Sequence, residues 1–137
     1  ALRAIAVEAA SAHGDLHLGN LFLDGGRLRA VDWGNYQPAF WGGYDVFHLF
    51  VTERVRRAGG GWVEVAAGAL SGAAAFELGP LCARPRDWVC YTLARVELEA
   101  AQDARLGRLG PKRRRKYARA LALLGPALAR PEDTWLT

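Results

Sequence analysis

The segment His13–Asn20, which reads HGDLHLGN, and the tripeptide Val31–Trp33 constrain this chain more than any other feature. Two short apolar runs lie between them, separated by Asp24–Arg27, which reads DGGR. Because glycine readily adopts the positive φ angles of a tight turn, this pattern predicts a β-hairpin. A hairpin returns its second strand to the start of its first strand. We therefore expect Asn20 and Asp32 to face one cleft.

The polar side chains around this hairpin are of the types that phosphoryl transfer requires. One carboxylate orients the attacking hydroxyl group and takes its proton, while an amide oxygen and a second carboxylate hold the magnesium ions that neutralise the phosphates. Asp15 and Asn20 lie five residues apart on one predicted loop, and Asp32 follows the second predicted strand. The sequence therefore contains one candidate for each of these tasks.

With HGDLHLGN followed by VDW, the chain resembles the catalytic segment of the aminoglycoside phosphotransferase and choline kinase-like family, whose members are relatives of the protein kinases. The resemblance covers residues 1–57 well and residues 58–137 only as a run of helices. It implies an α+β, mostly α fold: the helical C-terminal lobe of a kinase-like protein with one small β-hairpin. It also implies transfer of the ATP γ-phosphate to a hydroxyl group of a small molecule such as an aminoglycoside, choline or a sugar, with Mg²⁺ and ATP as cofactors.

The same resemblance assigns roles to residues of the motif. It makes Asp15 the catalytic base or hydroxyl-orienting residue, and Asn20 and Asp32 the magnesium ligands. His13, the first residue of the motif, would brace the loop.

Two further residues have supporting roles by the same resemblance. His17 fits the HGDLH variant of this motif. Asp45, at the start of a predicted helix, would accept hydrogen bonds from the backbone of the catalytic loop. No residue is assigned to nucleotide binding.

Three other interpretations remain open at this stage. The polar residues of the motif would, in the simplest case, only cap a turn and a helix. A metal hydrolase built on His13, Asp15 and His17 would need more ligands, and His48 is the only other histidine. We expect His48 to be a packing residue. A third alternative is a non-catalytic, kinase-like binding or assembly module.

The rest of the chain is predicted to be mainly helical. Residues 2–10 are rich in helix formers and predict the end of a helix, whereas residues 33–43 hold several glycines and a proline and predict a loop. In the helix expected at 44–57, Val46, Leu49 and Phe50 should face the core. Further helices are expected at 62–76, 86–106 and 111–124, followed by a tail over 130–137.

We interpret residues 1–137 as a single kinase-like C-terminal lobe, because only twelve residues precede His13 and no strand lysine lies there. A nucleotide-binding lobe would then be missing, and the isolated chain would be inactive. Its cleft wall would include Leu16, Leu18, Leu21 and Phe22. We expect either the missing lobe or self-association to cover this wall.

Composition and charge bear on the expected partners, on membrane crossing and on the state of the cysteines. The net charge is +4, and the basic run Lys112–Lys116 is expected to be a solvated helix start, so we do not expect a nucleic-acid partner. The longest uncharged apolar stretch, between Glu64 and Glu77, has twelve residues and is too short to cross a membrane. Cys82 and Cys90 have no partner motif and suggest reduced thiols in a cytoplasmic protein.

Overall fold

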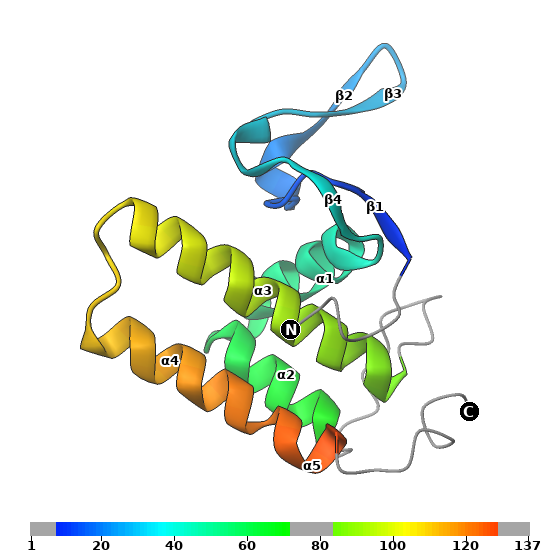
Figure 1. Ribbon diagram of the computed structural model, residues 1–137. Helices are drawn as coiled ribbons and strands as arrows, with labels where there is room; N and C mark the ends of the chain where they lie inside the picture. Colours follow the sequence, from blue (N-terminus) through cyan, green and yellow to red (C-terminus); the bar gives the residue numbers. More distant parts are fainter. Residues whose placement is uncertain (1–7, 72–83, 129–137) are drawn as a thin grey trace. The chain divides into compact units, whose positions relative to one another are not determined.

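The computed structural model describes residues 8–71 and 84–128 (Figure 1). The chain divides into two compact units, residues 1–62 and residues 63–137. The first contains all the strands of the described residues and one long helix, and the second is helical. The expectation of an α+β, mostly helical fold is confirmed at this level.

The predicted hairpin is present in the first unit. Strand β2 (Leu21–Asp24) pairs antiparallel with β3 (Arg27–Ala30), with Leu23 opposite Leu28. The two residues between the strands, Gly25 and Gly26, have φ angles of 55° and 76°. Two successive positive φ angles are typical of the type I′ turn that matches the twist of paired strands. The two glycines therefore set the register of the hairpin.

A second two-stranded sheet was not predicted. Strand β1 (Ala9–Ala12) pairs antiparallel with β4 (Gln37–Trp41), and the register shifts between Ala10 and Ala12. The prediction of a helix over residues 2–10 is therefore wrong for its described part at positions 9 and 10. The prediction of a loop over 33–43 is wrong as well, because a 3-10 helix, η3 (Trp33–Asn35), and β4 occupy most of it. Pairing between distant segments decided both, against the local propensity of the alanines.

Helix α1 (Tyr44–Ala58) agrees with the helix predicted at 44–57. Asp45 in its first turn and Arg56 and Arg57 in its last turn complement the helix dipole, and Gly59, with φ 74°, ends it. The buried face was assigned incorrectly, because Val46 is exposed. The residues that are buried instead follow the helical period from the first residue: Tyr44, Phe47, His48 and Val51.

The second unit consists of helices α2 (Trp62–Leu70), α3 (Pro85–Arg105), α4 (Pro111–Ala122) and α5 (Leu124–Leu128). Helix α3 packs against α4, and α5 contacts both. Pro85 and Pro111 each occupy the first turn of a helix, where the missing N–H has no intrahelical partner to lose. The helices predicted at 86–106 and 111–124 are present, while α5 was not anticipated. Residues 72–76 of the helix expected at 62–76, and the expected tail, lie outside the described residues.

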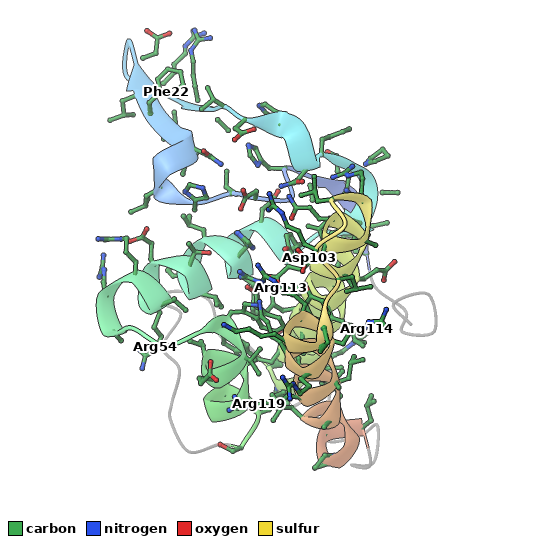
Figure 2. The ribbon with its side chains drawn as sticks, turned by 90° about the vertical axis from the view of Figure 1, so that its left-hand side faces the viewer. Phe22, Arg54, Asp103, Arg113, Arg114 and Arg119 are labelled. Carbon is green, nitrogen blue, oxygen red and sulfur yellow. The ribbon has the colours of Figure 1, made fainter. Side chains whose placement is uncertain are left out.

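Two residues of the basic run at the start of α4 form ion pairs within the second unit. Arg113 lies 3.4 Å from the carboxylate of Asp103, and Lys116 lies 2.6 Å from that of Glu99. Arg113 and Asp103 are labelled in Figure 2. Both carboxylates belong to α3. These ion pairs join the two helices, so part of the positive charge of the run has a structural explanation.

Two remaining expectations concern the membrane and the thiols. Among the described residues, no helix combines the length and apolar character needed to span a bilayer. Cys90 is a free, buried thiol on α3, and burial raises its pKa. Cys82 lies outside the described residues.

Candidate functional site

The loop that carries the motif is fixed to the start of α1 by one carboxylate. Asp45 Oδ2 accepts a hydrogen bond of 2.6 Å from the backbone N–H of His13, and Asp45 Oδ1 accepts one of 3.0 Å from that of Gly14. Asp45 lies in the first turn of α1, so the helix holds the loop backbone directly. These are the hydrogen bonds that the sequence analysis expected of Asp45.

Gly14 allows this close approach. Its φ is 84°, and a Cβ atom at this position would lie 2.1 Å from the backbone oxygen of Asn35. A side chain here would therefore meet both an unfavourable backbone conformation and a steric clash with η3. The second residue of the motif is glycine for both reasons.

His13 connects the loop with the far end of the hairpin. Its side chain is buried, and its Nε2 lies 2.7 Å from the backbone oxygen of Val31. Its Nδ1 accepts a hydrogen bond of 3.4 Å from the backbone N–H of Asp15. Since Nδ1 accepts, Nε2 carries the hydrogen and donates it to Val31. One imidazole ring thus links the backbone of Asp15 to the residue that precedes Asp32.

Asn20, at the start of the hairpin, hydrogen bonds to the same two segments as His13. Its backbone oxygen accepts a hydrogen bond of 3.0 Å from the N–H of Val31, and its side-chain Nδ2 donates one of 3.0 Å to the backbone oxygen of Asp15. The side chain is buried. Because Nδ2 is committed to the loop, the amide oxygen Oδ1 remains the end of the side chain that can act as a ligand.

His17 has a local role in the structure. It precedes the 3-10 helix η2 (Leu18–Asn20), and its Nδ1 accepts a hydrogen bond of 3.1 Å from the backbone N–H of Gly19. This contact caps the short helix that presents Asn20. His17 therefore supports the position of a candidate ligand.

Asp32 adopts a rarely populated backbone conformation. Its φ and ψ are 62° and 60°, and it is the one non-glycine residue with positive φ in the described part of the chain. Its side chain is exposed and does not cap η3, the helix that it precedes. Such outliers persist where the surrounding structure imposes them, and they gather at functional sites. Asp32 therefore presents an exposed carboxylate directly after the hairpin, and this carboxylate does not cap η3.

His48 is buried, in agreement with the expectation that it is a packing residue, and it also makes a specific contact. His48 Nε2 lies 3.1 Å from Asp15 Oδ1, and His48 Nδ1 lies 3.2 Å from the hydroxyl oxygen of Tyr44. One signal could have found this contact. Asp45 was expected to reach the loop, and a residue three positions further along a helix lies on the same side.

Asn20 and Asp32 fit a magnesium ion by their chemistry. Mg²⁺ prefers oxygen ligands, keeps several waters, and is commonly held by one or two carboxylates together with substrate phosphates. One amide oxygen and one exposed carboxylate, at the two ends of one hairpin, are oxygen donors of this kind. The hydrogen bond from Val31 N–H to the Asn20 carbonyl brings these ends together.

The geometry does not favour the metal-hydrolase alternative. Both ring nitrogens of His13 are engaged by backbone groups, and Nδ1 of His17 caps η2. Within residues 8–71 and 84–128, no group of three or more His, Cys, Asp or Glu side chains is arranged to hold a metal ion. The histidines of the motif support the loop instead.

Comparison with protein-family models, curated proteins and solved structures finds no match to this chain. A functional conclusion therefore depends on the chemistry and geometry of the site itself.

Proposed function

We propose that this chain carries the catalytic segment of an ATP-dependent phosphotransferase whose acceptor is a hydroxyl group of a small molecule. Asp15 is the catalytic base or hydroxyl-orienting residue, and Asn20 and Asp32 hold magnesium. His13 and Asp45 fix the loop, and His17 supports Asn20.

The observation that carries this proposal is the double engagement of the His13 ring. It hydrogen bonds to Asp15 N–H on one side and to Val31 O on the other, so it joins the candidate base to the segment that follows β3 and leads to Asp32. A loop that only capped a turn would not need a buried imidazole between these two segments. Phosphoryl transfer does need the base and the metal ligands in a fixed relation, because positioning supplies much of its catalysis.

The exposed fractions of the side chains agree with a bracing role for His13 and a substrate-contacting role for Asp15. The bracing residue His13 is 2% exposed, whereas the side chain of Asp15 is 40% exposed and can meet a substrate. Asp15 would accept a hydrogen bond from the acceptor hydroxyl and take its proton as the oxygen attacks the γ-phosphorus of ATP, while the bond from that phosphorus to the bridging oxygen breaks and ADP leaves. Bound magnesium would supply neutralisation of phosphate charge next to Asn20 and Asp32.

The test is a comparison of two isosteric variants in the full-length protein. Asp15→Asn should abolish phosphate transfer to small hydroxyl acceptors and leave the Kd for Mg-ATP nearly unchanged, because Asp15 contacts the acceptor. Asp24→Asn is the matched control, since Asp24 lies on the hairpin that follows the loop, in an exposed ion pair with Arg29. Transfer at a near-normal rate by Asp15→Asn would refute the assignment.

A non-catalytic binding or assembly module is the second candidate. One observation favours it: Leu23 and Leu28, a cross-strand pair on the hairpin, are 74% and 66% exposed. An apolar pair of this kind is suited to docking against another surface. A protein that binds Mg-ATP weakly or not at all, and transfers no phosphate to any acceptor, would support this alternative.

A further inference from the structure

We propose that His48 is a positioning residue for Asp15, and that it holds the Asp15 carboxylate in one orientation through a hydrogen bond whose direction is set by Tyr44. The kinetic part of this inference rests on the proposed phosphotransferase function. The hydrogen-bond part does not.

The geometry forms a chain of three side chains. Asp15 Oδ1 lies 3.1 Å from His48 Nε2, and His48 Nδ1 lies 3.2 Å from the Tyr44 hydroxyl oxygen. The His48 side chain is only 7% exposed, and Tyr44 is 1% exposed. Asp15, at the other end, is 40% exposed. The chain therefore leads from a buried phenol to a carboxylate that a substrate can reach.

The chemistry of the groups assigns the donors. An ionised carboxylate only accepts hydrogen bonds, so His48 Nε2 carries the hydrogen that points to Asp15. In a neutral imidazole Nδ1 is then an acceptor, and the Tyr44 hydroxyl is its donor. The Tyr44 contact thereby selects the histidine tautomer that can hold Asp15. A neutral His48 is sufficient for this role.

Helix α1 would then hold both the backbone of the loop and the side chain of Asp15. Asp45 binds the loop backbone at His13 and Gly14, whereas His48, on the next turn, binds the side chain of Asp15. Both residues belong to α1, and Tyr44 precedes them at its first position. A base acts efficiently only when its oxygen is aligned with the proton that it takes, so fixing the carboxylate should affect the chemical step more than substrate binding.

A residue that only filled space would behave differently. His48→Leu keeps a buried side chain but removes the donor, whereas His48→Gln keeps an N–H donor near the position of Nε2. With a positioning role, His48→Leu should lower kcat about 10- to 100-fold while the KM for Mg-ATP stays nearly unchanged, and His48→Gln should recover most of the loss. Tyr44→Phe, which frees the tautomer, should fall between them.

The experiment combines these kinetics with NMR of the full-length protein labelled with ¹⁵N histidine. In the wild type, the His48 ring should show the neutral Nε2–H tautomer, and Asp15→Asn should shift the His48 Nε2 resonance. Val46→Ala, an exposed position on the same helix, is the control that should change neither readout.

Two results would overturn the inference. One is a His48 ring spectrum that does not respond to Asp15→Asn. The other is an equal loss of kcat in folded His48→Leu and His48→Gln variants. If the His48 resonance responds to Asp15→Asn but the wild type transfers no phosphate, the proposed function is rejected. The hydrogen bond between His48 and Asp15 would still stand.

Discussion

The carboxylate of Asp45 accepts a hydrogen bond of 2.6 Å from the backbone N–H of His13, a residue 32 positions earlier in the chain. The next N–H, that of Gly14, donates to the other carboxylate oxygen. Two consecutive donors on one ionised group form a rigid connection, because hydrogen bonds to a charged acceptor are stronger than those between neutral groups. This connection ties the loop to the start of α1.

Loss of that charge should destabilise the loop. We expect Asp45→Asn to lower the free energy of unfolding by about 1.5–3 kcal/mol, because an amide oxygen can replace only one of the two acceptors and lacks the charge. Denaturant unfolding measures the loss, and hydrogen exchange at the His13 and Gly14 amides locates it. Asp24→Asn should change neither. Unaltered protection of both amides in Asp45→Asn would show that the carboxylate does not hold the loop.

The glycine of the motif offers a paired comparison. Gly14→Ala should destabilise the protein by about 3 kcal/mol or more, because it combines a φ of 84° with a Cβ atom 2.1 Å from Asn35 O. Gly25→Ala has a positive φ of 55° but open space around the Cβ, and should cost only about 1 kcal/mol. Thermal or denaturant unfolding of both variants separates the steric term from the backbone term. Equal losses would mean that the contact with Asn35 is not a constraint.

Metal binding should depend on Asp32 and Asn20. Mn²⁺, a paramagnetic substitute for Mg²⁺, should broaden the NMR signals of residues next to both positions when ATP is present. We expect Asp32→Asn to weaken this broadening and the affinity for Mg-ATP together, since it removes the charged ligand. Asn20→Ala should have a smaller effect of the same kind, because it removes a neutral one. Broadening centred away from the hairpin would place the metal elsewhere.

The ion pairs of Glu99 should make the stability of the second unit fall in acid. Burial would raise the pKa of Glu99, but Arg95 and Lys116 outweigh this effect, and the pKa lies below its ordinary value of 4.5. A group with a lowered pKa adds stability above that ordinary value and loses it as the pH falls through the lower, folded-state pKa. Glu99→Gln should therefore reduce stability at neutral pH and flatten the loss of stability below about pH 4.5. Glu97→Gln, an exposed position on the same helix, is the control for the substitution itself.

The exposed apolar pair on the hairpin should influence association. Leu23 and Leu28 share one face of the hairpin, and Phe22, labelled in Figure 2, belongs to the other. We expect Leu23→Ser with Leu28→Ser to leave the stability of the folded chain within about 0.5 kcal/mol and to reduce self-association in sedimentation experiments. Leu121→Ser, an exposed leucine on α4, is the control. Self-association that persists in the double variant would exclude this face as the contact.

The sequence predicted the elements whose signals are local. The Gly25–Gly26 turn specified the hairpin, because few other residues adopt two successive positive φ angles. The prolines at 85 and 111 marked the starts of α3 and α4 within one residue. The spacing of HGDLHLGN and VDW also indicated that Asn20 and Asp32 lie at the two ends of one hairpin. Each of these depends on contacts between residues close in the chain.

Only the tertiary structure decided the rest. Ala9–Ala12 became a strand because β4, 28 residues further on, offers it a hydrogen-bonding partner, and no local pattern encodes that pairing. The contact of His48 with Asp15 spans 33 positions and depends on which face of α1 meets the loop. The sequence alone favoured Val46 for the buried face, whereas the fold buries Tyr44, Phe47 and His48. Residue types and short spacings thus determined which chemistry is available to this chain, and long-range packing determined which side chains hold it in place.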